Sequence, residues 1–168
     1  MTPAQLVDAA LDFVRDWYDT FRFFKERDIE WTLQKHIWTL IEDHDLPMRV
    51  FDQHSMPGGN RADIVITDTA LTVLFIVELK YEPNKERADI LGVKVPATNW
   101  QEIIQDIEKV DGYVLRREAP VAISILVDEG SEYRGKALPL HAPAEWIDWT
   151  PYVSRHPVSV LTTRFGVA

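Results

Sequence analysis

The sequence predicts an α/β domain with a mixed central sheet of about four to five strands flanked by helices. The first 43 residues show helical amphipathic periodicity, and short apolar segments separated by turn signals follow between residues 49 and 81. A further helical segment and a buried strand extend to residue 127. The order helix, three-strand meander, helix, strand is typical of a mixed α/β domain.

Composition limits the domain count and the function classes. The 168 residues contain no repeat and no Gly/Ser-rich linker, which predicts one domain. A net charge of −9 argues against a general nucleic-acid coat protein or a polybasic membrane binder, because both depend on a positive field. Cysteine is absent, which excludes a disulfide framework, a thiolate zinc site and a cysteine nucleophile. No signal peptide or membrane-length apolar run is recognised, so we expect a cytoplasmic protein without a membrane partner.

Residues 3–25 are predicted to form an amphipathic helix that precedes the core. Apolar side chains recur there at spacings of three or four residues: Leu6, Ala10, Phe13, Trp17, Phe21 and Phe24. Packing against the core is the commoner role of such a stripe. The alternative is a surface that pairs two copies of the chain.

A second helix is predicted over residues 28–43, with Leu33 and Ile37 in its inward stripe. Glu30 lies three residues before Leu33 and seven before Ile37, which places a carboxylate on the apolar side of the helix. A buried carboxylate needs a partner, a metal ion or a wet cleft. The alternative is a glutamate that interacts only with the helix dipole.

Strands, turns and a third helix account for the following segments. The turn around Pro57 separates the first two strands, Pro83 ends the third strand, and Asn99 is a plausible helix cap. The predicted elements are strands at 49–54, 62–67 and 71–81, a loop at 84–98, a helix at 99–116, and strands at 121–127 and 158–162.

Three charged residues lie in strands that are otherwise apolar: Asp63, Glu78 and Lys80. Glu78 and Lys80 are two positions apart and therefore share one face of their strand. If Asp68 faces Val73 across an antiparallel hairpin, Asp63 faces Glu78, with Cβ atoms about 5 Å apart. Two carboxylates at this separation repel each other unless a cation lies between them, and an oxygen-preferring divalent ion suits them.

An Asp in one strand followed by Glu-x-Lys at the end of the next resembles the PD-(D/E)XK, or restriction-endonuclease-like, nuclease superfamily. The resemblance covers residues 28–127 as a nuclease-like core, with residues 1–27 as an N-terminal helix and 128–168 as a C-terminal extension. It implies Mg²⁺-dependent cleavage of nucleic-acid phosphodiesters, with Mn²⁺ as an alternative ion and DNA as the favoured substrate. One departure is Ala62, which stands where the family's name has proline.

The resemblance also assigns roles to individual residues. Asp63 and Glu78 would hold the metal ion, and Lys80 would orient the attacking water or offset developing negative charge. Glu30 matches a first-helix acid that some members use for a second metal ion or water. Gln101 and Gln105 match, less closely, a polar residue that some members place on the next helix to contact substrate.

Other interpretations of the same residues stay open. Asp63 or Glu78 can form an ion pair with Lys80 in a half-buried sheet. A nuclease-like fold without activity can act as an accessory or protein-interaction subunit. The acidic balance favours a basic protein partner or a homodimer. A local positive patch beside the site is expected from Lys80, Lys85, Arg87 and Lys94.

Overall fold

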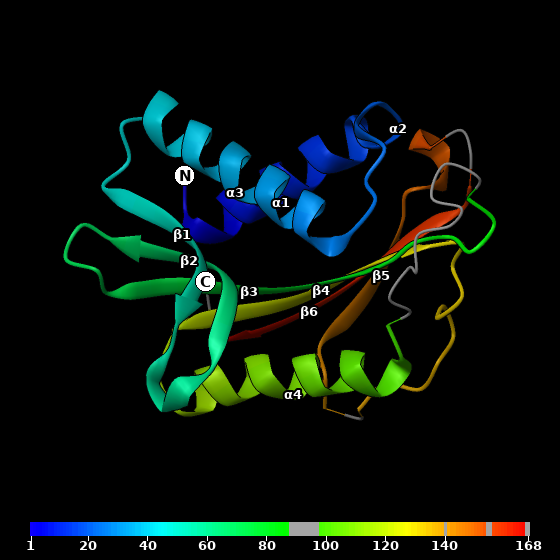
Figure 1. Cartoon of the computed structure of the whole chain (residues 1–168). Helices are drawn as coiled ribbons and strands as arrows, with labels where there is room; N and C mark the ends of the chain where they lie inside the picture. The colour runs from blue at the N-terminus through cyan, green and yellow to red at the C-terminus, as the bar shows by residue number, and fades with distance from the viewer. Residues whose placement is uncertain (88–97, 140, 154–155, 167–168) are drawn as a thin grey trace.

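The computed structural model describes residues 1–87, 98–139, 141–153 and 156–166 (Figure 1). A mixed six-stranded sheet lies between two helical layers, which confirms the predicted α/β class and exceeds the predicted number of strands. The helices are α1 (Pro3–Asp16), α2 (Tyr18–Phe21), α3 (Glu26–Asp43) and α4 (Trp100–Leu115). The strands are β1 (Met48–Ser55), β2 (Arg61–Asp68), β3 (Val73–Glu82), β4 (Val121–Glu129), β5 (Ala144–Asp148) and β6 (Val158–Gly166).

The strand order is β1-β2-β3-β4-β6-β5. β3 and β4 pair in parallel, and the chain crosses between them through α4, while the other neighbouring pairs are antiparallel. β5 is the strand that the sequence pattern did not predict, and it lies at the edge beside β6. Residues 128–168, expected as an extension, therefore supply two strands of the central sheet.

Two hydrophobic cores fill the space between the sheet and the helical layers. α1 and α3 cover one face, and α4 covers the other (Figure 1). β3 alternates as expected, with Phe75, Val77 and Leu79 packed into the α1/α3 core and Ile76 into the α4 core. Glu78 and Lys80 lie two and four residues after Ile76. Their side chains therefore point to the same face of β3 as Ile76, the face that α4 covers.

The predicted continuous helix over residues 3–25 is wrong. α1 ends at Asp16, and the left-handed backbone of Arg22, with φ 50°, ends the single turn of α2. Leu6 and Ala10 are buried, whereas Trp17 is 49% exposed, because the stripe leaves the core where the helix breaks. Within the described ranges, no helix has the length and apolar character needed to cross a membrane.

Candidate functional site

The hairpin of β2 and β3 carries the centre of the site. Ile64 faces Val77, as expected, and the next residues along, Asp63 and Glu78, are close enough for the charge of Asp63 to act on Glu78. Asp63 Oδ2 accepts a 2.8 Å hydrogen bond from the backbone N–H of Leu79, between the two charged residues of the Glu-x-Lys segment. At the loop end the expected register is wrong, because a bulge sets Thr67, rather than Asp68, against Val73.

Glu78 is a buried carboxylate with two partners on α4. Lys109 Nζ lies 2.7 Å from Glu78 Oε2, and the Tyr113 hydroxyl donates to Glu78 Oε1 at 3.2 Å. Burial, reinforced by the nearby charge of Asp63, raises the pKa of Glu78 to about 8, although Lys109 opposes this shift. Burial therefore favours the neutral form of this carboxyl group more strongly than water does.

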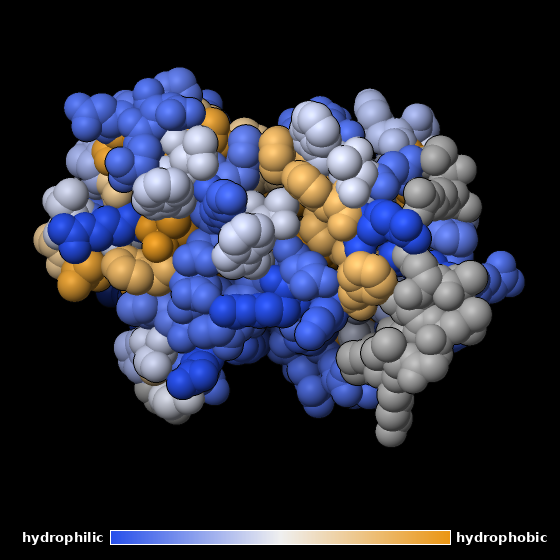
Figure 2. All heavy atoms as spheres, turned by 45° about the horizontal axis from the view of Figure 1, so that its top comes forward, coloured by the Kyte–Doolittle hydropathy of each residue, from blue (hydrophilic) through white to orange (hydrophobic). Residues whose placement is uncertain are grey.

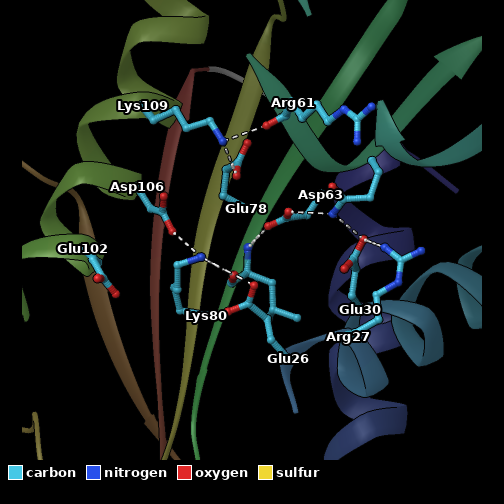
Figure 3. Close-up of polar contacts among 12 residues, drawn as sticks. Glu26, Arg27, Glu30, Arg61, Asp63, Glu78, Lys80, Glu102, Asp106 and Lys109 are labelled. Atoms are coloured by element: carbon cyan, nitrogen blue, oxygen red, sulfur yellow. Dashed lines mark hydrogen bonds and ion pairs between the residues drawn. The ribbon is translucent and has the colours of Figure 1, made fainter. Parts of the chain in front are cut away.

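Lys80 lies between acids from two helices (Figure 3). Its ammonium is 3.3 Å from Asp106 Oδ2 on α4 and 3.5 Å from Glu26 Oε1 on α3. Burial lowers the pKa of Lys80, but the negative charges of Asp106, Glu26 and Asp63 outweigh burial and leave that pKa raised. Lys80 is therefore a firmly charged cation within the cluster.

Glu30 points inward, as its helical spacing predicts, and is 3% exposed. Arg27 Nη1 donates to Glu30 Oε1 at 2.7 Å, and the side-chain amide of Gln53 donates to the same atom at 3.0 Å. The Gln53 amide also donates to Asp63 Oδ1 at 3.1 Å. Burial raises the pKa of Glu30, against the opposing effect of the Gln53 hydrogen bond.

Gln53 reaches both carboxylates through an unusual backbone conformation. Its φ of 45° lies in the left-handed region, between the regular pairs Asp52–Ile64 and His54–Ala62 of β1 and β2. Non-glycine residues adopt this conformation at a cost, and such positions concentrate at functional sites. The local irregularity of β1 thus connects the α3 part of the cluster to Asp63.

The structure brings together four of the six predicted site residues: Glu30, Asp63, Glu78 and Lys80 (Figure 3). Gln101 and Gln105 are exposed on α4, and their role in substrate binding stays a prediction. The cluster also contains residues that sequence reasoning did not assign to it: Glu26, Gln53, Asp106, Lys109 and Tyr113.

Helical spacing carried a usable signal for the α4 residues. Asp106, Lys109 and Tyr113 follow one another at intervals of three and four, beside the buried stripe of Ile103, Ile107 and Val110. Polar residues that flank a buried stripe lie at the border of the helix face that packs on the sheet. The packing of α4 against β3 and β4 then determines which strand residue each one meets.

The donor chemistry of Asp63 and Glu78 fits a divalent oxygen-preferring ion. Their charges are close enough to raise the pKa of Glu78, and a cation between them would relieve that repulsion. Among the described residues, no group of three or more His, Asp or Glu is arranged to hold a metal ion. Mg²⁺ commonly takes only one or two carboxylates and keeps several waters.

Two of the four residues expected to form a positive patch after β3, Lys85 and Arg87, are engaged in ion pairs. Arg87 is 6% exposed and contacts Glu129 Oε2, the Tyr81 hydroxyl and the Phe23 carbonyl oxygen. Lys85 pairs with Glu132 at 2.6 Å, and Lys94 lies outside the described residues. Lys85 and Arg87 therefore form local ion pairs, and Lys80 is the member of the expected patch that lies in the cluster.

The fold and the cluster define this chain as an α/β domain with acids and lysines gathered between β2, β3, α3 and α4. No family model, no curated protein and no solved structure matches the chain. The functional assignment therefore depends on the chemistry of the cluster.

Proposed function

We propose that this chain is a metal-dependent nuclease of the PD-(D/E)XK type. The observation that carries the proposal is the convergence of Asp63, Glu78 and Lys80 at one place on two paired strands. Buried, electrostatically coupled ionisable groups of this kind mark functional sites more often than they add stability. Asp-then-Glu-x-Lys on neighbouring strands is the pattern by which the sequence resembles that superfamily.

Each residue of the cluster has a role in this proposal. Asp63 and Glu78 would hold the divalent ion, and Gln53 orients Asp63 and Glu30 through its bridging amide. Lys80, kept charged by Asp106 and Glu26, contacts the negative charge that develops on the phosphoryl group. When bound, Mg²⁺ supplies positive charge for the phosphate oxygens and lowers the pKa of the attacking water.

The proposal predicts cleavage of single-stranded or duplex DNA in Mg²⁺ or Mn²⁺ and none in EDTA. Asp63→Asn, Glu78→Gln and Lys80→Met should each lower the cleavage rate by about a hundredfold or more, as loss of a charge-stabilising group does elsewhere. Glu108→Gln is the matched control, because Glu108 is exposed on α4. Thermal unfolding verifies that each variant is folded. A wild-type protein that cleaves no nucleic acid with either ion contradicts the proposal.

One observation favours a non-catalytic alternative, in which the fold is an accessory subunit. Glu78 already has Lys109 and Lys80 already has Asp106, so the cluster contains its own counter-charges. Isothermal titration with Mg²⁺ separates the two functions. Heat of binding that disappears in Asp63→Asn supports the nuclease, and no binding together with no cleavage supports the accessory role.

A further inference from the structure

An aromatic groove lies between the α1–α2 segment and α3, on the side of α3 away from the sheet. Its volume is about 850 Å³, and Phe13, Phe21, Phe24 and Trp31 contribute rings to its lining. Phe21, Phe24 and Trp31 are 41%, 47% and 55% exposed, respectively. Figure 2 brings this face forward and shows apolar side chains at the surface with hydrophilic side chains around them. Exposed rings at this density are typical of a binding surface.

The groove carries positive charge in a chain whose net charge is −9. Arg22, Arg27 and Lys35 are among its described lining residues, and Asp28 is the one acid. Asp28 Oδ2 accepts hydrogen bonds from the backbone N–H groups of Phe24 and Lys25, where it caps α3. Arg27 is paired with Glu30 and Asp52, so Lys35, which lies over the Trp31 ring, is the cation that the groove offers to a ligand.

Rings and cations alternate along one face of α3. Arg27, Trp31 and Lys35 follow each other at intervals of four residues, and Lys35 Nζ lies 4.9 Å from the centre of the Trp31 ring. Across the groove, the His36 ring stacks on Phe13 at 4.0 Å, and burial lowers the pKa of His36. The groove thus presents aromatic rings and cationic side chains at regular intervals along α3.

Arg27 connects this groove to the candidate site. It lines the groove, and its guanidinium also contacts Glu30 Oε1 and Asp52 Oδ2 at 2.7 and 2.6 Å. Glu30 shares the Gln53 amide with Asp63. A series of contacts, Arg27 to Glu30, Glu30 to Gln53 and Gln53 to Asp63, therefore links the groove to the carboxylate cluster.

We propose that the groove binds single-stranded nucleic acid, stacking unpaired bases on Trp31 and Phe24 and contacting phosphates through Lys35. This inference rests on the proposed nuclease function and names its substrate class. Exposed rings alternating with cations match a backbone of phosphates and bases, whereas a duplex keeps its base faces stacked internally.

The test is fluorescence anisotropy with a labelled oligodeoxythymidine and a labelled duplex of equal length, in EDTA, so that binding is measured without cleavage. We expect tighter binding of the single strand. Trp31→Ala should weaken that binding roughly tenfold, the loss of one base–aromatic stack. Lys35→Ala should weaken it and lower the slope of log affinity against log salt by about one.

Matched control variants distinguish binding in the groove from nonspecific binding to the rest of the surface. Trp38 is also 55% exposed on α3 but does not line the groove, and Lys136 is exposed in the loop between β4 and β5. Trp38→Ala and Lys136→Ala should leave single-strand binding unchanged. Equal losses in Trp31→Ala and Trp38→Ala, or equal binding of duplex and single strand, overturn the proposal. A dimer that Trp31→Ala dissociates overturns it in favour of self-association.

Failure of the groove proposal and failure of the nuclease proposal give different results in the binding and cleavage experiments. If cleavage needs Asp63 and a metal ion while Trp31→Ala changes neither binding nor cleavage, the groove proposal is overturned and the nuclease stands. If no cleavage occurs but single-strand binding depends on Trp31 and Lys35, the groove proposal stands and the nuclease fails.

Discussion

At the scale of single residues, Glu78 links the ionisation of the candidate site to the stability of the fold. Its pKa in the folded protein is about 8, against an ordinary value of 4.5. Between these values the folded protein keeps a proton that the unfolded chain releases. The free energy of unfolding of the metal-free protein should therefore fall as the pH rises from about 5 to about 8, by roughly 1.4 kcal/mol per unit of pKa difference.

Urea unfolding in EDTA across this pH range measures the effect. Glu78→Gln keeps the side-chain shape and removes the titration, so its free energy of unfolding should depend less on pH than that of the wild type. Parallel pH profiles for the two proteins would contradict the raised pKa. Glu108→Gln, on the solvent side of α4, serves as the control.

Gln53 allows the backbone and side-chain contributions to be separated. Gln53→Ala and Gln53→Gly both remove the amide that bridges Glu30 and Asp63, but only glycine adopts φ 45° without cost. The free energy of unfolding of Gln53→Gly should therefore be about 1 kcal/mol higher than that of Gln53→Ala. Chemical denaturation of the two variants measures this difference. Equal stabilities would show that this backbone conformation relaxes in the variants.

At this scale, period-two alternation and the hairpin register were enough to predict that Asp63, Glu78 and Lys80 converge. The same reasoning could not supply Lys109 and Asp106, because their contacts depend on how α4 crosses the sheet. It also could not supply the Gln53 bridge, because a left-handed glutamine inside a strand has no local sequence signal. Tertiary packing determines these contacts.

At the scale of elements, α4 has to keep its position against the sheet so that Asp106, Lys109 and Tyr113 can contact β3. Asn99 caps this helix, and its side-chain oxygen accepts from the Glu102 N–H at 3.0 Å while Glu102 returns a contact to the Asn99 N–H. Asn99→Ala should lower the free energy of unfolding by about 1 kcal/mol, and Asn99→Ser should restore most of it. Chemical denaturation checks both changes.

The same substitution also tests whether the N-terminal cap of α4 affects the proposed metal site. The Asn99→Ala change frays the first turn of α4, two turns before Lys109, so Mg²⁺ affinity should change less than stability does. A large loss of Mg²⁺ affinity with unchanged stability would show that Asn99 acts on the site directly.

Some elements were predictable because their signals are local. Asn99 was recognised as the α4 cap, and the inward stripe of α3 was identified from Leu33 and Ile37. The break after Asp16 was missed because Trp17 and Phe21 continue the apolar period although the backbone does not. β5 was missed because Glu145 and Asp148 make a short, exposed edge strand with a weak apolar pattern.

At the scale of the whole molecule, the pairing of β4 with β6 ends at Gly166. It pairs with Val121 at the end of β6 and has φ 89°, and a Cβ there would collide with the carbonyl oxygen of Pro120. Gly166→Ala should therefore destabilise the protein by at least about 1 kcal/mol. Gly135→Ala, at a positive φ but with open space around it, is the control for backbone strain alone.

Thermal unfolding of the two glycine variants measures this difference. Gly166→Ala should lower the melting temperature more than Gly135→Ala, because only Gly166 is crowded by a neighbouring backbone. Equal decreases would show that the β4–β6 end yields to accommodate the methyl group.

The position of β6 has a consequence for synthesis of the chain. All nine residues of β4 are buried, and β6 supplies the hydrogen-bonding partner for one side of that strand. A ribosome releases β4 well before β6, so the nascent chain passes through a stage in which an apolar strand has an open edge. Stalled or prematurely terminated chains that lack residues 158–166 should therefore associate through this edge and depend on chaperones.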